Sequence, residues 1–254
     1  MRSRHRTGCA LRKSVLPFGQ IVFLALAAWP CYEIGVLTIA GNFRVVIPGR
    51  IYRSGQPGAG QLEAWIGRYN LRTIVNLRGS TSPRADEEEA IADATGVRLV
   101  HIALTASRPM TRKQLQRVIG VLDTAEEPML IHCAQGIDRS GTVSALAAWL
   151  IGGEPYDEAR WQAYVPPGPW KNKRGFGHIS DTLDSYEAYC QSIGEDRNDA
   201  ACFRRWAADI YYDSQGYMAE RLGLDTTDPN DVQADGAILA DIPSGRPKQA
   251  AAAQ

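Results

Sequence analysis

Residues 131–141 read IHCAQGIDRSG. Its cysteine, Cys133, precedes its arginine, Arg139, by six positions, and the hydroxyl of Ser140 follows directly. An apolar run leads into the stretch, and a helix-like run at 142–150 leads out. A short loop between a strand and a helix N-terminus turns successive backbone N–H groups toward one point, where they bind phosphate-like anions. The stretch therefore predicts an anion cradle with a thiol at its base.

The thiol and the arginine of this cradle suit phosphoryl transfer. Arg139 can present a planar fork of N–H donors to two phosphate oxygens. Its charge and the helix N-terminus are expected to lower the pKa of the Cys133 thiol. A thiolate beneath a bound phosphoryl group is a nucleophile placed for in-line attack. We therefore expect two steps, in which Cys133 takes the phosphoryl group as a thiophosphate and water then removes it.

The neighbouring residues fit the same chemistry. Ser140 is expected to donate a hydrogen bond to the cysteine sulfur and ease its departure, and His132 to orient the loop. The alternative is a buried structural cysteine, because free cysteine is common in protein cores. The arginine, glycine and hydroxyl in register favour the catalytic loop. The remaining residues expected to bind the phosphoryl group are Ala134, Gln135, Gly136, Ile137 and Gly141.

The pattern His-Cys-x5-Arg-Ser-Gly, at 132–141, resembles the signature of the protein tyrosine phosphatase superfamily, in its dual-specificity-like branch. Two upstream blocks, PGRIYRSGQP at 48–57 and TIVNLR at 73–78, resemble the opening segments of bacterial members of that branch. The resemblance covers residues 42–192, and its three blocks occur in the family's order. Rhodanese-like domains also place a cysteine loop after a strand, but they need neither the Arg-Ser-Gly exit nor the upstream blocks.

The resemblance also implies an aspartate that acts as general acid from a separate loop ahead of the cysteine. The corresponding segment, 101–110, reads HIALTASRPM and contains no acidic residue. One candidate acid lies inside the cradle, at Asp138; myotubularin-like and Sac-like phosphatases also carry aspartates in their cysteine loops. The alternative for Asp138 is a structural carboxylate beside Arg139, with a lowered pKa that makes it a poor acid. Both interpretations stay open.

Two upstream arginines, Arg53 and Arg78, follow apolar strand-like runs. Either is placed to line the cradle and assist phosphate binding. The alternative is a solvated arginine at a strand end, and Gln56 carries the same ambiguity.

Composition limits the possible functions independently of the motif. The 254 residues, 44% of them hydrophobic, suffice for one full core. With 28 basic and 28 acidic residues, the chain has no net charge that would favour nucleic-acid binding. Four histidines and five cysteines show no metal-ligand spacing, so we expect no metal and no cofactor. Cys190 and Cys202 are two helix thiols or, in an exported domain, a disulfide.

The N-terminus predicts a membrane segment. Residues 1–14 carry five Lys or Arg and no acid, and 15–40 are mostly apolar, with an uninterrupted apolar stretch at 21–32. A basic flank stays on the cytoplasmic side, so we expect an uncleaved anchor in the inner membrane and a periplasmic catalytic domain. A cleaved signal peptide, and a cytoplasmic protein with a buried N-terminal helix, are the alternatives.

Strands and helices alternate along the rest of the chain. This order predicts an α/β fold, a mainly parallel central sheet flanked by helices on both faces, with the site at the carboxyl end of a central strand. The helix at 84–94 is expected to be solvated at Asp86, Glu87, Glu88 and Glu89. Expected strands are 42–52, with a turn at Pro48-Gly49, and 73–77, 97–102 and 129–132. Expected helices are 61–69, 84–94, 111–122, 142–150, 156–164, 180–192 and 199–222.

Four segments follow from this organisation. They are an N-terminal membrane segment at 1–40, a phosphatase domain at 42–195, a helical extension at 196–224 and a disordered tail at 225–254. The basic loop at 166–175 either flanks the site or is solvated.

The cradle also limits the substrate. Its variable positions, Ala134, Gln135, Ile137 and Asp138, include no lysine or arginine, whereas phosphatases of highly phosphorylated inositols place basic residues there. The sequence therefore favours a phosphorylated protein or peptide, with phosphotyrosine first and phosphoserine or phosphothreonine second. A phosphoinositide monophosphate and a phosphate-binding pseudoenzyme are the alternatives.

Overall fold

The computed structural model describes residues 41–164 and 178–211. The expected membrane segment, the basic loop at 166–175 and the predicted tail at 225–254 lie outside these residues. Within the two described ranges, no helix combines the length and the apolar character that a membrane crossing requires.

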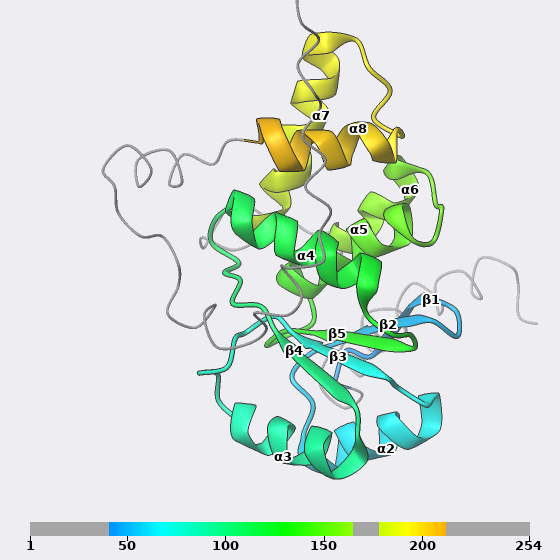
Figure 1. Cartoon of the computed structure of the whole chain (residues 1–254), viewed down its shortest axis with the longest axis vertical. Helices are drawn as coiled ribbons and strands as arrows, with labels where there is room; N and C mark the ends of the chain where they lie inside the picture. Colours follow the sequence, from blue (N-terminus) through cyan, green and yellow to red (C-terminus); the bar gives the residue numbers. More distant parts are fainter. Residues whose placement is uncertain (1–40, 165–177, 212–254) are drawn as a thin grey trace, which may run out of the picture.

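A five-stranded sheet forms the centre of the fold, with the strand order β1-β2-β5-β3-β4 (Figure 1). β2, β5, β3 and β4 run parallel, and only β1 pairs antiparallel, with β2. The prediction of a mainly parallel sheet is therefore confirmed. The strands are Arg44–Ile47 (β1), Ile51–Ser54 (β2), Thr73–Asn76 (β3), Arg98–His101 (β4) and Met129–His132 (β5).

The segment predicted as extended over 42–52, with a turn at Pro48-Gly49, is two strands joined by a tight turn at that position. The chain reverses at Gly49, whose φ of 74° lies in the left-handed region, and the Arg50 N–H donates to the Ile47 carbonyl at 3.0 Å. β2 then continues to Ser54, two residues beyond the predicted end. This reversal places β2 next to β5 and brings the 48–57 block to the site.

The strand register brings three strand ends together. Ser54 of β2 and Asn76 of β3 both lie opposite His132, the last residue of β5. Cys133 follows directly, at the edge of the sheet where parallel α/β folds bind their ligands. The predicted position of Cys133, at the carboxyl end of a central strand, is confirmed.

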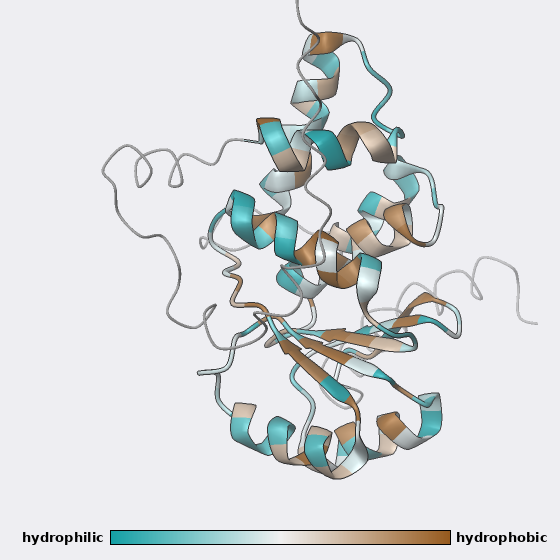
Figure 2. Cartoon of the chain, viewed as in Figure 1, coloured by the Kyte–Doolittle hydropathy of each residue, from teal (hydrophilic) through white to brown (hydrophobic). Residues whose placement is uncertain are grey.

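Helices cover both faces of the sheet (Figure 1). Ile74 and Leu130 pack in one core with α2 and α3, whereas Val75 and Ile131 pack in a second core with α4 and α5. Since the central strands are buried on both faces, they are apolar over most of their length (Figure 2). The four helices are Ala59–Tyr69 (α2), Ala85–Thr95 (α3), Arg112–Thr124 (α4) and Asp138–Leu150 (α5).

Helix α5 begins at Asp138, four residues before the predicted start at 142. The arginine and the serine of the cradle therefore lie in its first turn, where backbone N–H groups lack helical partners. Residues 140–149 are all buried, because α5 lies between the sheet and the C-terminal helices. A helix enclosed on all sides is apolar all round, which explains the absence of a polar stripe along α5.

The C-terminal helices share the core of α5. Trp149 packs against Tyr156, Tyr186 and Phe203, with ring centroids 5.0, 5.7 and 5.0 Å away. The predicted helix at 199–222 is α-helical only to Arg205 within the described residues, and a π-helical turn follows it. These elements are Tyr156–Ala159 (α6), Arg160–Tyr164 (η1), His178–Ser180 (η3), Asp181–Ile193 (α7), Ala200–Arg205 (α8) and Trp206–Ile210 (η4).

Cys190 on α7 and Cys202 on α8 are buried free thiols. Burial raises the pKa of Cys190, with a smaller contribution in the same direction from Cys202. The structure thus has two helix thiols here and no disulfide between them.

Candidate active site

Cys133 lies at the floor of the loop that joins β5 to α5. Its side chain is 2% exposed, and its sulfur accepts a hydrogen bond from the Gly136 N–H at 3.2 Å. The Ser140 hydroxyl lies 3.4 Å from the same sulfur. The loop therefore curls around the thiol, and the Ser140 hydroxyl lies within hydrogen-bond distance of the sulfur.

Gly136 is required by the shape of this loop. Its φ is 71°, and a Cβ atom at this position would lie 2.5 Å from the Gly55 nitrogen and 2.6 Å from the Ser54 carbonyl carbon. Both are backbone atoms, so no rotamer change would relieve the contact. The loop and the end of β2 approach each other too closely for any side chain.

The segment after β2 forms one wall of the cradle. The Cys133 N–H donates to the Ser54 carbonyl at 3.4 Å, and the Gln56 N–H donates to the Ala134 carbonyl at 3.1 Å. At Gly55, a Cβ atom would lie 3.2 Å from the Ala134 oxygen. The upstream block at 48–57 thus holds the catalytic loop through its backbone.

Asn42, which lies just before β1, also holds the loop in place. Its side-chain amide donates to the carbonyl oxygens of Gln135 at 2.9 Å and Gly136 at 2.8 Å, and it is itself fully buried. Arg44 Nε in turn donates to the Asn42 side-chain oxygen at 2.9 Å. Nothing in the local sequence identifies Asn42, because its only local signal is a Gly-Asn turn and its partners lie 93 and 94 residues away.

Arg139 is held at the carboxyl edge of the sheet. Its Nη1 donates to the Leu77 carbonyl at 3.4 Å and to the Leu104 carbonyl at 3.3 Å. Leu77 follows β3 directly and Leu104 is the third residue after β4, so the loops that follow two strands orient the guanidinium. Leu104 belongs to the segment at 101–110, where the family resemblance placed an acid that this chain lacks.

Arg53 lies behind the cradle. Its side chain is 0% exposed and its Nη1 donates to the Gln162 carbonyl, while Nε and Nη2 have no hydrogen-bond partner among the described residues. Burial and the nearby charge of Arg44 lower the pKa of Arg53 to about 10, and Cys133 acts in the opposite direction. Arg53 is therefore a buried cation near the nucleophile at neutral pH. The alternative of a solvated arginine is wrong for this residue.

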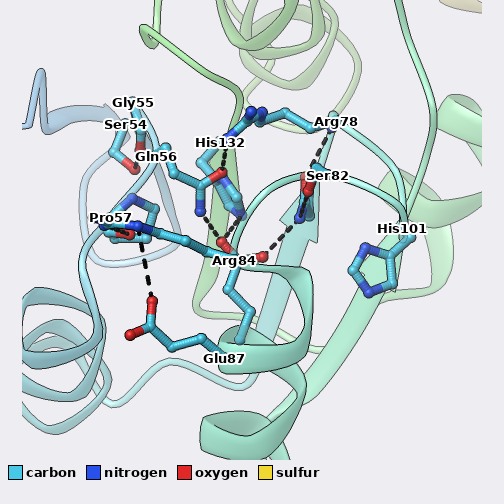
Figure 3. A network of polar contacts seen from close by, with 12 residues as sticks. Ser54, Gly55, Gln56, Pro57, Arg78, Ser82, Arg84, Glu87, His101 and His132 are labelled. Atoms are coloured by element: carbon cyan, nitrogen blue, oxygen red, sulfur yellow. Dashed lines mark hydrogen bonds and ion pairs between the residues drawn. The ribbon is translucent and has the colours of Figure 1, made fainter.

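A polar network lies on the other side of β5 (Figure 3). The Glu88 carboxylate accepts hydrogen bonds from the side-chain amides of Gln56 and, at 2.6 Å, of Asn76. His132 Nε2 lies 3.4 Å from the same carboxylate. Arg78 Nη1 donates to the Gln56 side-chain oxygen at 2.6 Å. Arg78 and Gln56 thus meet beside the cradle.

The expectation that Glu88 is solvated is wrong, because its side chain is only 2% exposed. Asp86, Glu87 and Glu89 are exposed as predicted. Burial acts to raise the pKa of Glu88, but the nearby His132 and the donors Gln56 and Asn76 outweigh it and hold the pKa below its ordinary value. The sequence alone does not single out Glu88, because the four consecutive acidic residues at 86–89 cannot be distinguished without the fold.

Asp138 is half-buried at the start of α5. Burial raises the pKa of Asp138, although Arg139 and the helix backbone act to lower it. This direction is opposite to the one expected from the neighbouring arginine alone. Within the described ranges, no three His, Cys, Asp or Glu side chains are grouped so that they could hold a metal ion.

One family model matches the part of the chain that forms this site. The family model described as a DSP-PTPase phosphatase fused to NAD+ kinase matches residues 46–163, which span the strands, the catalytic loop and α5. Residues 46–163 thus form a domain of the protein tyrosine phosphatase superfamily, in its dual-specificity-like branch. This phosphatase-family domain accounts for the loop at 131–141 and for both upstream blocks.

Two curated relatives that match this chain are rice proteins. The inositol diphosphatases DSP1 and DSP2 of Oryza sativa subsp. japonica are 33% identical over 114 residues and 31% identical over 107 residues. The alignments cover 43% and 40% of this chain and 50% of each relative. The chain thus spans about half the length of the curated relatives it matches.

Solved structures resemble the chain more distantly. The core catalytic domain of the PP-IP phosphatase SIW14 from S. cerevisiae is 22% identical, with a TM-score of 0.43, over 60% of this chain and 93% of that one. TpbA of P. aeruginosa is 23% identical, with a TM-score of 0.41, over 54% and 80%. The family assignment rests on the domain model and the motif.

Proposed function

We propose that this protein is a cysteine-dependent phosphomonoester hydrolase that acts on phosphorylated proteins, phosphotyrosine first, through a thiophosphate on Cys133. One observation carries the proposal. The buried sulfur of Cys133 receives the Gly136 N–H and lies beside the Ser140 hydroxyl, at the N-terminus of a helix that carries Arg139. This arrangement supports a phosphate bound above a nucleophile.

The first step forms a sulfur–phosphorus bond and breaks the bond from phosphorus to the leaving oxygen. We assign the proton for that oxygen to Asp138, because burial raises the pKa of its carboxyl and the segment at 101–110 has no acid. In the second step Asp138 takes a proton from water, which attacks phosphorus. The Cys133 sulfur then leaves as a thiolate toward the Ser140 hydroxyl.

Positive charge beneath the loop supports the thiolate in both steps. Arg139 lies in the first turn of α5, and Arg53 lies buried near the sulfur. A buried guanidinium with unused donors stabilises a nearby anion more than a solvated one does, because water screens it less. We therefore assign Arg53 to the stability of the thiolate rather than to direct contact with substrate.

The preference for a protein substrate rests on the charge of the cradle. Its variable positions contain no basic residue, and Asp138 adds a half-buried acid beside the phosphate position. Such a loop suits a substrate with one phosphate. The second candidate, an inositol diphosphate, is favoured by the names of the two rice relatives.

Turnover measurements test the proposal. Wild-type protein should hydrolyse an aryl phosphate and a phosphotyrosine peptide, and Cys133→Ser should abolish both activities. Cys190→Ser, which alters a buried thiol on α7, is the matched control and should retain activity. Faster release of phosphate from an inositol diphosphate than from the peptide would favour the second candidate. Vanadate binding without any turnover would identify a phosphate-binding pseudoenzyme.

The location of the protein is a separate proposal that rests on the sequence at 1–40. We infer an inner-membrane anchor with the catalytic domain on the periplasmic side. A C-terminal fusion to an enzyme that is active only after export should then be active in intact cells. Activity confined to a reporter that works only in the cytoplasm would overturn this placement.

A further inference from the structure

A buried carboxylate joins the ends of three strands beneath the catalytic loop. Glu88, on α3, contacts His132 at the end of β5, Asn76 at the end of β3 and Gln56 just after β2. Two of these residues contact the cradle directly. His132 precedes the nucleophile, and the Gln56 N–H holds the Ala134 carbonyl.

The chemistry of the partners requires an ionised acid at this position. The amide nitrogens of Gln56 and Asn76 can only donate, so both oxygens of Glu88 must accept. The lowered pKa of Glu88 agrees with this requirement. An amide side chain in its place would direct an NH2 group at another donor, and a buried mismatch of this kind is costly.

Glu88 also decides the orientation of the His132 ring. His132 is 0% exposed, and neither ring nitrogen has a hydrogen-bond partner of normal geometry among the described residues. The carboxylate, 3.4 Å from Nε2, is the polar group that faces the ring. An ionised acceptor at that distance favours the form of the ring with a proton on Nε2.

The Glu88 carboxylate is also linked to Arg78, at the edge of the cradle, through the side chain of Gln56. The Gln56 amide nitrogen donates to Glu88, which leaves its oxygen to accept from Arg78 Nη1 at 2.6 Å. Figure 3 shows Arg78, Gln56 and His132 along this path. Loss of the carboxylate would free Gln56 to rotate, and the half-buried Arg78 would lose its fixed partner.

The geometry points to Glu88 as a positioning residue of the phosphatase site, one that fixes the His132 tautomer and, through Gln56, orients Arg78. The expected effect of Glu88 on kinetics rests on the proposed function, because that effect concerns the rate of the proposed reaction. The expected effect of Glu88 on structure concerns the proton on one ring nitrogen of His132, and it does not depend on turnover.

Two measurements on Glu88→Gln test the inference. Long-range nitrogen–proton correlation NMR should show the proton of His132 on Nε2 in the wild type and a shift toward the other tautomer in the variant. With an aryl phosphate, kcat/KM should fall roughly 10- to 100-fold, the range expected for a small misplacement of reacting groups. Asp86→Asn removes an exposed acid from the same turn of α3 and should change neither result.

The outcomes separate this inference from the proposed function. A wild-type His132 that carries its proton on Nδ1 alone would overturn the inference, and this measurement needs no variant that folds. An unchanged tautomer and unchanged kinetics in Glu88→Gln would overturn it as well. Absence of turnover in the wild type, with the Nε2 proton present, would overturn the proposed function and leave the positioning of His132 intact.

A second variant probes the path to the rim. Gln56→Met removes the link to Arg78 and leaves Glu88 and His132 in place. We expect the His132 tautomer to stay on Nε2, while vanadate inhibition weakens several-fold. Vanadate inhibition equal to that of the wild type would overturn the part of the inference that concerns Arg78.

Discussion

The backbone nitrogen of Gly136 lies 3.2 Å from the sulfur of Cys133, and this contact closes the catalytic loop over the nucleophile. The closure depends on a left-handed backbone at Gly136 and on its direct approach to the end of β2. Because both conditions exclude a side chain, the contact can be removed by a single methyl group.

Gly136→Ala should abolish turnover and lower the free energy of unfolding by about 2 kcal/mol or more, since a Cβ atom would collide with backbone. Gly153→Ala is the matched control, because Gly153 has a φ of 72° and open space around it. It should cost only about 1 kcal/mol, with full activity. Chemical denaturation and aryl phosphate kinetics check both, and equal effects of the two variants would show that the close approach is unimportant.

Asn42→Ala should destabilise the protein by about 1–3 kcal/mol, because two buried carbonyls of the loop lose their donor. It should also lower kcat/KM. Asn42 has a φ of 52°, so part of any cost comes from the left-handed backbone. Asn70→Ala measures the cost of the left-handed backbone alone, since Asn70 has a φ of 50° at the end of α2. An identical loss of stability in both variants would contradict the role of the Asn42 amide.

Asp138→Asn should slow the hydrolysis of phosphotyrosine, whose leaving oxygen needs a proton, and spare an activated aryl phosphate, whose leaving oxygen does not. Asp93→Asn, on the exposed side of α3, is the control. The sign of the pH effect follows from the raised pKa of Asp138. The acid form is present at low pH, and the acid-dependent rate is lost as pH rises through the folded pKa. Equal losses on both substrates would exclude the acid role.

Arg53→Met should slow alkylation of Cys133 by iodoacetate near neutral pH, because the thiolate loses a buried cation nearby. The free energy of unfolding should stay equal or rise, since replacing a buried charge that lacks full pairing by an apolar side chain is often stabilising. Arg50→Met, which breaks an exposed ion pair with Glu127, controls for loss of charge. Unchanged alkylation in Arg53→Met would show that this arginine does not influence the sulfur.

Glu88 should make stability depend on pH only in the acid range. Its folded pKa lies below the ordinary value of 4.5, so its contribution is complete above that pH and is lost as pH falls through the folded pKa. The difference in unfolding free energy between the wild type and Glu88→Gln should therefore be constant at neutral pH and shrink below 4.5. A difference that changes across neutral pH would assign the effect to another group.

The sequence identified the parts of the site that depend on local spacing. The strand, loop and helix around Cys133 follow from residues close together in the chain, and so does the placement of Arg139 and Ser140. The prediction of α5 began four residues late, because the loop motif and the start of the helix share the same residues. The site roles themselves, Asp138 included, stay predictions until they are measured.

By itself the sequence determined the family, the mainly parallel sheet and the loop that bears the thiol, because each is encoded in short-range pattern. Only the tertiary structure decided which of four similar acids is buried, that Asn42 binds a loop 93 residues away, and that Arg53 lies behind the cradle. These facts depend on the packing of α3, β1 and β2 around the end of β5. Burial and long-range hydrogen bonds are properties of that packing, and no local spacing records them.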